Sequence, residues 1–390
     1  MSKQWEREKP FQLLRRMDGS EYSDEIILNW YKARAYVLDK LRDVAIGPNS
    51  GEHLHVVVIC DCPLMLSVAR QVALSAHYAN FEEHDAKGTL TCCNRTVITI
   101  VSQNENIVEE LKKEEYLCNL LDLCKYSVFG VAPVNKDSYL DIEFEIVKDW
   151  QGKETEFLKV MTAEDVEIVL GGKEEQEIES IDTRKAVLAN RMYKLGELID
   201  NLPAEDIHCA HRYVMALDVF QHDLLRKPIE GEKRGGVLSN VFCADCFESR
   251  AKGIKQYCEE KNKERAKNKE KKMKEEEAWE ECNEALSKSE HARWVVEKLI
   301  LGFRPLNDDE RWEDERRFGS AKQDFRKQLK KRSKDPAHID LCSYADLRRI
   351  SPDDLKFDSF LMLAIPKIMR KVENNSLCSA KRLRKHARTN

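Results

Sequence analysis

The fold of this chain is decided by "HLHVVVICDCPLMLSVARQVALSAHYA", residues 53–79. Its first eight residues form a short run rich in β-branched side chains, which is typical of a buried strand. Pro63 then opens a segment that we expect to be helical, because proline is favoured in the first turn of a helix. The stretch therefore predicts a strand that leads directly into a helix, the building unit of α/β proteins.

The same unit recurs over residues 51–202. The further strand-like runs are "RTVITIVS" (95–102), "LDIEFEIVKDW" (140–150) and "DVEIVLGG" (165–172), and the amphipathic helical segments are 106–126 and 182–202. Alternation of strand and helix over about 150 residues predicts a parallel α/β domain of Rossmann type. Residues 1–50 are expected to form a helical extension, with Ser23 as the N-cap of its main helix.

The composition excludes several classes of protein. The 390-residue chain has 35% charged residues, a mean hydropathy of −0.59 and a formal net charge of −5. These values indicate a soluble protein with no overall attraction to nucleic acid. There is no run of about 18 apolar residues and no apolar stretch near the start "MSKQWEREKP". We therefore expect a cytoplasmic protein that does not cross a membrane, with its 13 cysteines mostly reduced.

A second stretch, "EHARWVVEKLILGFRP" (290–305), has an unusual feature for a helix. Its apolar residues recur at three- and four-residue spacing and predict a core-facing stripe. At about 100° per residue, Trp294 points roughly 160° away from the middle of that stripe. It shares the other face with Glu290, His291, Glu297 and Lys298. The largest aromatic residue of this helix is thus predicted to lie among charged side chains.

These residues resemble the first helix and turn of the ryanodine-receptor (RyR) domain, whose pattern is roughly R-W-x-x-E-K-x-x-x-G-W/F-R. The second half of that pattern resembles "HIDLCSYADLRRISPDDLKFD", residues 338–358. The resemblance covers under a quarter of the chain. It departs from the family in the long, charged insertion 306–335, which either covers or displaces the family's binding groove.

The resemblance implies a small all-α RyR-type domain over residues 286–375. Such domains occur as paired repeats in animal calcium-release channels. They also occur as single copies in bacterial and phage proteins, often beside a Rossmann-like domain, and this chain resembles the second kind. In the channel repeats the domain can hold an adenine nucleotide against aromatic side chains. For this chain the resemblance implies recognition of an adenine-containing or NAD-derived ligand, with phage defence or nucleotide signalling as the setting.

The residues themselves support such a site, since an indole on a polar face can stack on a base. We expect Trp294 to stack on the base, Lys298 and Arg304 to meet phosphates, and Tyr344 to form a second wall, with His291 and Glu297 as secondary contacts. The alternative is that Trp294 packs against Tyr344 and Phe357 in the core of a small domain. The two alternatives are compatible if Trp294 forms the floor of a shallow groove.

The α/β part lacks the fingerprint of a dinucleotide site. The turn after its first strand reads "ICDCPLMLS" (59–67) and contains no glycine, where G-x-G-x-x-G would let a pyrophosphate approach. Asp61 would repel a phosphate there, and Pro63 has no N–H to donate. An NAD(P)-dependent oxidoreductase is therefore the least favoured function, and we expect no catalytic residues.

Two short pairs could together bind zinc: His208 with His211, and Cys243 with Cys246. The alternative is that the two histidines lie on a helix surface and the two thiols are buried. Residues 203–285 are otherwise expected to be a charged helical linker, because "EEKNKERAKNKEKKMKEEEAWEE" (259–281) has almost no apolar face. Residues 376–390 form a basic tail.

The sequence thus predicts a non-enzymatic, nucleotide-binding sensor or regulatory protein that acts on a small-molecule nucleotide. It could act alone, as a homo-oligomer or with a partner protein. A structural or assembly subunit without any small-molecule ligand is the main alternative. Such a subunit would form a stable oligomer and bind none of the nucleotides.

Overall fold

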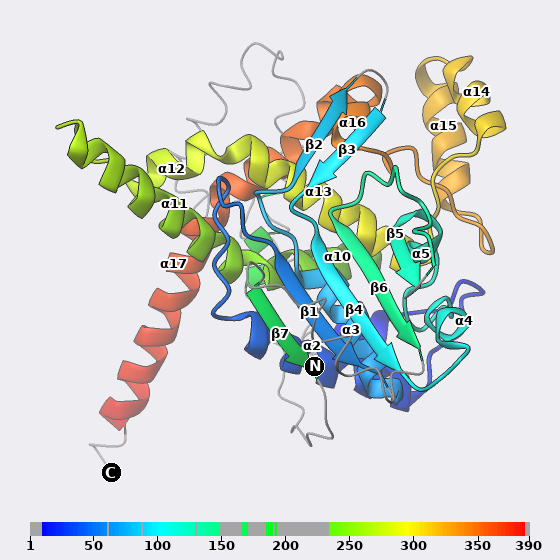
Figure 1. Ribbon diagram of the computed structural model, residues 1–390, viewed down its shortest axis with the longest axis horizontal. Helices are drawn as coiled ribbons and strands as arrows, with labels where there is room; N and C mark the ends of the chain where they lie inside the picture. Colours follow the sequence, from blue (N-terminus) through cyan, green and yellow to red (C-terminus); the bar gives the residue numbers. More distant parts are fainter. Residues whose placement is uncertain are drawn as a thin grey trace.

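The structure is a computed structural model. It describes residues 10–148 apart from 61, 87–88 and 129–130, residues 166–170, five positions between 185 and 192, and residues 234–386. Figure 1 shows a twisted sheet with helices behind it and a long C-terminal helix that extends away from the body.

The central sheet has five strands, and every neighbouring pair is parallel. Their order is β5 (Lys125–Val128), β6 (Ile142–Lys148), β4 (Thr96–Ser102), β1 (Leu54–Ile59) and β7 (Val166–Leu170). The predicted α/β class is therefore confirmed, and the four predicted strands are all present. The order differs from that of a dinucleotide-binding sheet, because β6 lies between β4 and β5.

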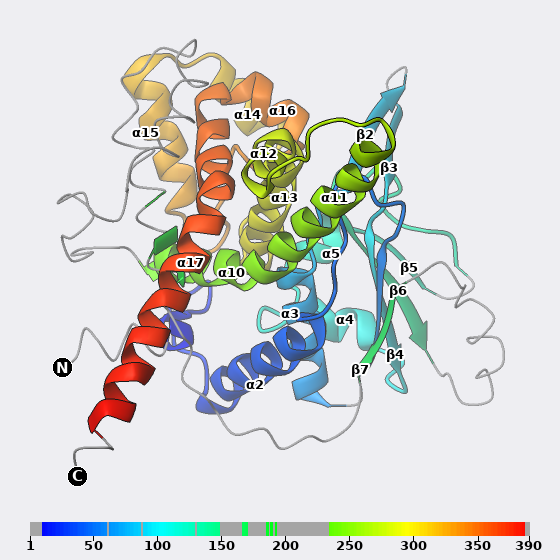
Figure 2. The same cartoon turned by 90° about the vertical axis from the view of Figure 1, so that its left-hand side faces the viewer.

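The two faces of the sheet differ in polarity. The face that carries Val56, Val58, Ile98, Ile100 and Phe144 is buried in the main core. The described helices gather on this side, as the nearly edge-on view in Figure 2 shows. The opposite face carries a polar row, in which the His55 ring lies 2.7 Å from Thr99 and the Thr99 hydroxyl donates to Glu145.

The helical layer contains α2 (Asp24–Leu41), α3 (Pro63–Ser75), α10 (Arg234–Asp245) and α13 (Asn283–Ile300). Helix α2 begins where expected, since the Ser23 hydroxyl accepts the Ile26 N–H. One core joins Phe11 of the short 3-10 helix η1 (Pro10–Leu13) with Val56 of β1, Phe242 of α10 and Val296 of α13. The predicted extension, α/β domain, linker and RyR-like segment thus all contribute to a single core.

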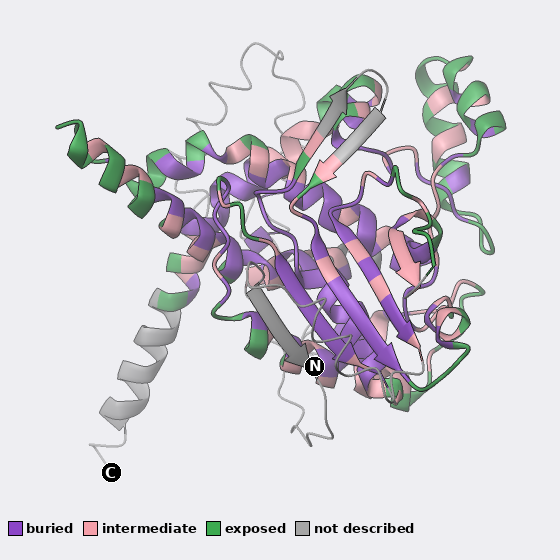
Figure 3. Cartoon of the chain, in the orientation of Figure 1, coloured by how far each residue is buried: buried purple, intermediate pink, exposed green. Residues whose placement is uncertain are grey.

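The described part of the predicted linker holds α10, α11 (Phe247–Lys267), α12 (Glu275–Glu281) and the start of α13. Phe242, Phe247 and Trp279 are buried in the two largest cores. The distal end of α11, which carries much of the predicted charged run, is largely exposed and projects from the body (Figure 3). Helix–helix packing therefore accounts for α10, the first part of α11 and Trp279 of α12, and charge for the exposed end of α11.

The prediction of one continuous helix over 106–126 was wrong. The segment forms α4 (Ile107–Leu111), a series of turns, and α5 (Leu120–Leu123), followed at once by β5. Cys118 has a φ of 48°, a left-handed conformation that no helix interior accepts. An antiparallel hairpin, β2 (Glu82–Ala86) with β3 (Thr89–Cys93), was also not predicted.

The C-terminal part contains α14 (Asp308–Glu315), α15 (Gly319–Lys330), α16 (Tyr344–Ile350), the 3-10 helix η3 (Pro352–Asp354) and α17 (Leu355–His386). Ser343 caps α16 by accepting the Asp346 N–H. Ser351 does not cap the next helix through its side chain; its hydroxyl donates to Asp340 instead. No helix among the described residues is both long and apolar enough to cross a membrane.

Candidate functional site

The polar face of α13 is buried, which corrects the predicted surroundings of Trp294. Glu290, His291, Arg293 and Glu297 are each at most 4% exposed, whereas Trp294 is half-buried. The helix is covered on several sides because it packs against α3, α10, α16 and α17. Apolar spacing predicted one buried face, but the charged residues opposite it are buried as well.

A buried ion-pair network explains how this is tolerated. Arg293 bonds to Glu290 through Nε at 3.0 Å and to Glu297 through Nη1 at 2.8 Å. Arg250 of α11 reaches Glu290 with Nη1 at 2.7 Å, and the Ser239 hydroxyl donates to Glu297 at 2.8 Å. Burial alone would raise the pKa of Glu290, but Arg293 and Arg250 outweigh it and lower that pKa. These motif residues therefore join α10, α11 and α13 to one another.

Glu297 was predicted as a secondary ligand contact. Its carboxylate accepts from Arg293, Lys298 and Ser239, and its side chain is 0% exposed. Burial acts to raise the pKa of Glu297, and Lys298 and Arg293 reverse this so that the carboxylate stays charged. The structure places it in the interior, where it positions Lys298.

Aromatic and imidazole rings form a continuous row beside this network. Neighbouring ring centroids lie 4.9–6.4 Å apart in the order Tyr344, His291, Trp294, His338 and Phe303. The His338 ring meets Trp294 edge-on, at 80° and 4.9 Å. Trp294 thus contacts His338 of the second half of the motif, whereas Tyr344, which the core alternative placed against Trp294, contacts His291 instead. Part of the Trp294 surface stays exposed.

The two histidines of the row are neutral. His291 donates from Nε2 to the Cys342 carbonyl at 3.0 Å, and burial lowers its pKa. His338 accepts the Asp340 N–H at Nδ1, so the proton of its neutral ring lies on Nε2. Burial, together with Lys330 and Lys298, lowers the pKa of His338 well below its ordinary value. His338 therefore presents a neutral N–H donor beside Trp294.

Cations surround the exposed end of the row. The Lys298 ammonium lies 5.5 Å from the Trp294 ring centroid. Lys330 of α15 is an exposed residue. Loss of water around its ammonium group lowers its pKa, although Asp340 and Asp354 act to raise it. Burial, with Asp340 nearby, raises the pKa of Asp354 to about 6. The insertion therefore contributes charge to this surface, which we call the Trp294 patch: Trp294, Lys298, Phe303, Lys330 and His338.

Two predicted contacts lie elsewhere. Arg304 is held by Glu310 at 2.7 Å and by Asp335 at 2.6 Å, so its guanidinium closes the base of the insertion. Tyr344 is buried behind His291 and does not form a second wall beside Trp294. Of the six predicted residues, the structure brings Trp294 and Lys298 together at the surface.

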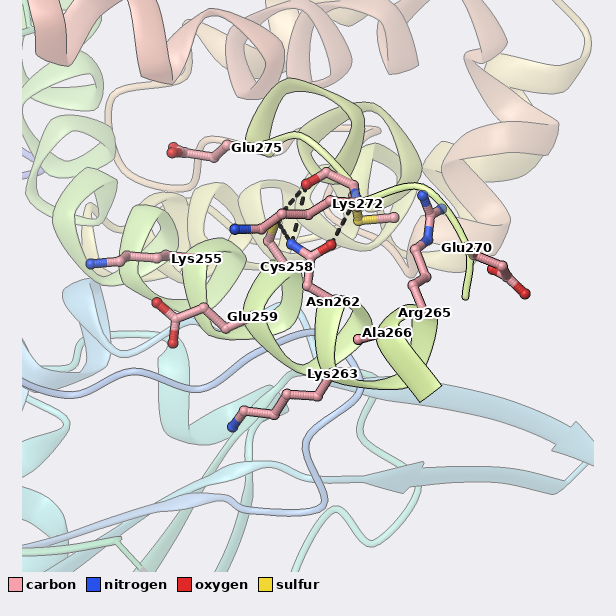
Figure 4. Close-up of a pocket in the computed structure, with 11 residues that line it drawn as sticks. Lys255, Cys258, Glu259, Asn262, Lys263, Arg265, Ala266, Glu270, Lys272 and Glu275 are labelled. Atoms are coloured by element: carbon pink, nitrogen blue, oxygen red, sulfur yellow. Dashed lines mark hydrogen bonds between the residues drawn. The ribbon is translucent and has the colours of Figure 1, made fainter. Parts of the chain in front are cut away.

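Two cavities lie outside the patch. One of about 10 Å³, the space of a single water molecule, lies behind His291 and is lined by Glu83, Tyr139 and Tyr344 among others. The other is an open pocket of about 760 Å³ between α11 and the loop before α12 (Figure 4). Lysine, arginine and glutamate side chains line it together, and Asn262 bridges its floor to the Met273 backbone. Its lining residues include no aromatic ring, so it is a poorer candidate for a base.

The predicted zinc ligands are only partly visible, since His208 and His211 lie outside the described residues. Cys243 and Cys246 are buried at the junction of α10 and α11, and the Cys246 thiol donates to the Ser75 carbonyl. Burial raises the pKa of both thiols, which agrees with the alternative of a buried thiol pair. Within the described ranges, no three His, Cys, Asp or Glu side chains are grouped to hold a metal.

In the turn after β1, polar groups of neighbouring residues are already in contact with one another. The Ser102 hydroxyl donates to the Cys60 carbonyl at 3.1 Å, and the Cys60 thiol contacts the Met65 carbonyl at 3.5 Å. Cys62 is the N-cap of α3 and Pro63 its first residue. Asp61 is not among the described residues.

Sequence reasoning missed part of the patch. Phe303 and His338 were motif positions, but nothing in their spacing showed that they meet. Lys330 and Asp354 carried no signal, because one lies in a lysine-rich helix and the other in an ordinary helix start. The perturbed pKa values that mark them depend on tertiary burial.

Comparison with known proteins adds no further identification. No family model, no curated protein and no solved structure matches this chain. The RyR resemblance therefore stands on the quoted residues alone.

Proposed function

We propose that the chain is a non-enzymatic cytoplasmic sensor that binds an adenine-containing nucleotide at the Trp294 patch. The observation that carries this proposal is the environment of Trp294. Its partly exposed indole meets the His338 ring edge-on and has the Lys298 ammonium 5.5 Å from its ring centre. A rigid aromatic face beside cations suits a base linked to phosphates.

The proposed contacts follow from the chemistry of each group. Adenine stacks on Trp294, and the neutral Nε2–H of His338 donates to a ring nitrogen or ribose oxygen. Lys298 and Lys330 attract the phosphates, while Glu297 holds Lys298 in place at 2.6 Å. His291 and Tyr344 support the indole from behind. The RyR resemblance agrees with this assignment and makes nucleotide signalling, such as phage defence, the proposed setting.

The ring row also offers a route from the patch to the α/β part. His291 and Tyr344 line the small cavity that Glu83 of β2 and Tyr139 close from the other side. A ligand that orders Trp294 would restrict His291, and with it the contact with the β2–β3 hairpin. We propose this contact as the path by which ligand occupancy reaches the sheet.

The test is a thermal-shift panel with ATP, ADP, AMP, NAD, ADP-ribose and cyclic ADP-ribose. We expect one of them to raise the melting temperature by several degrees in the wild type and in Tyr36→Ala, but not in Trp294→Ala. Tyr36 of α2 is the matched control because it is a partly exposed ring outside the patch, with the Lys40 ammonium 5.5 Å from its centre. No shift with any nucleotide at millimolar concentration would remove the proposal and favour the structural-subunit alternative.

A further inference from the structure

The insertion forms a helical hairpin that exposes two large aromatic rings, one of which, Trp312, has the Arg316 guanidinium 4.2 Å from its ring centre. Helices α14 and α15 project from the body in Figure 1. Trp312 of α14 is 58% exposed, and Phe318, just before α15, is 81% exposed. These are the two largest of the exposed apolar side chains in the described parts of the chain. Two large rings exposed so close together are typical of a surface that contacts another macromolecule.

The hairpin divides its charges between its two helices. Residues 308–315 contain six acids and one base, and residues 319–334 contain seven bases and one acid. Within one chain the helices already pair, since Arg326 binds Asp314 through two bonds of 2.7 and 2.8 Å. This ion pair shows that an acidic side chain of α14 can pair with a basic side chain of α15.

Some charged side chains at the start of α14 and after the end of α15 form no ion pair with a described residue. Asp308 and Asp309 are exposed and form no ion pair with any described residue. The same holds for Lys331 and Lys334 at the end of α15. The hairpin therefore carries an unpaired acidic end, next to Trp312, and an unpaired basic end.

We propose that two copies of this chain dimerise through the hairpin. In a two-fold symmetric pair, the acidic end of each α14 meets the basic end of the other copy's α15, so both contacts form at once. Trp312 and Phe318 of each copy are then buried between the hairpins. A second copy fits better than nucleic acid, because Asp308 and Asp309 would repel phosphates beside Trp312.

The size of the surface sets the expected affinity. A buried aromatic side chain covers about 150–250 Å², so the four rings of a dimer cover on the order of 600 Å² or more. A stable interface buries about 1,200–2,000 Å² in total. The four rings alone cover less than this, so the interface is small, and we expect a weak dimer that dissociates on dilution through the micromolar range and weakens in high salt.

Sedimentation velocity over a concentration series tests this with two charge-reversed variants. One is Asp308→Lys with Asp309→Lys, and the other is Lys331→Glu with Lys334→Glu. In each variant alone both symmetric contacts become repulsive, so we expect a monomer. In an equimolar mixture both contacts become attractive, and a dimer should return.

Circular dichroism establishes that both variants are folded before they are mixed, and Trp312→Ser with Phe318→Ser should also yield a monomer. A wild type that stays monomeric throughout the series would overturn the proposal. So would a wild-type dimer that persists in both charge variants, or two monomeric variants that do not associate when mixed.

Discussion

Arg293 holds together the buried charges of α13. It contacts both Glu290 and Glu297, and burial leaves these carboxylates no water to replace it. Removing one partner of a buried ion pair costs about 3–5 kcal/mol. We therefore expect Arg293→Met to lower the free energy of unfolding by that amount in urea titrations.

The matched control for this change is Arg348→Met. Arg348 also pairs with a glutamate of α13, Glu284, at 2.8 Å, but both side chains are more than half exposed. Its loss should cost under about 1 kcal/mol. Equal losses in the two variants would show that the buried network does not hold α13.

Glu83, which lines the cavity behind His291, makes the free energy of unfolding depend on pH. Burial is the main cause that raises its pKa from 4.5 to about 7, and Lys288, Asp141, Asp346 and Arg95 are the charged groups around it. Between pH 4.5 and about 7, the Glu83 carboxyl is mostly protonated in the folded protein and mostly ionised in the unfolded chain. The group's stabilising contribution is therefore full below about pH 4.5 and is lost as the pH rises through 7.

We expect Glu83→Gln to match the wild type near pH 5 and to exceed it by about 1–2 kcal/mol near pH 8. This value is reduced from about 1.4 kcal/mol per pKa unit because Glu83 keeps some contact with solvent. Urea unfolding of both proteins at the two pH values measures it. A difference that does not change with pH would contradict the buried-carboxyl assignment.

At this scale the sequence predicted that Trp294 keeps some exposure but not the role of its neighbours. The apolar stripe placed the indole away from the core, whereas it packs against the edge of the main core and is only partly exposed. Helical spacing cannot show that Glu290 and Glu297 face Arg250 and Ser239, since those partners lie on other helices. Arg304 was assigned to phosphate for the same reason, because its partner Asp335 is 31 residues away in sequence.

At the scale of elements, α11 crosses the loop after α2 so closely that only glycine fits. A Cβ on Gly253 would lie 2.5 Å from the Ile46 carbonyl oxygen, and neither backbone can move freely. Helix propensity favours alanine over glycine by about 1 kcal/mol, but overpacking costs about 1–3 kcal/mol. We expect Gly253→Ala to destabilise the protein in thermal and urea unfolding.

The control for this contact is Gly51→Ala, where a Cβ would meet nothing within 4 Å and φ lies outside the left-handed region. It should leave stability unchanged. A stabilised Gly253→Ala would show that α11 can move away from the loop and that helix propensity prevails.

The same elements show what local patterns can predict. The four strands were predicted from their apolar, β-branched runs, and in β1, β4 and β6 these runs are buried on at least one face of the sheet. Strand β5 and the β2–β3 hairpin were missed because "KYSV" and "EEHDA" have no apolar run or clear alternation. The helix over 106–126 was overpredicted because periodicity did not reveal the left-handed turn at Cys118.

At the scale of the whole molecule, the RyR-like helices and the sheet layer are not separate bodies. Val295 and Val296 of α13 lie in the same core as the apolar face of α3 and the inner face of β1. Sequence patterns indicate which residues are buried but not which partner buries them, so the shared core could not be predicted. A ligand at the Trp294 patch would therefore act on a helix that is continuous with the α/β layer.

The central claim is that this patch binds an adenine nucleotide, and saturation-transfer NMR tests it most directly. With the wild type and ATP or NAD, we expect saturation of the adenine H2 and H8 protons, retained in Tyr36→Ala and absent in Trp294→Ala. Absence of adenine saturation in the wild type, or its persistence in Trp294→Ala, would contradict the account.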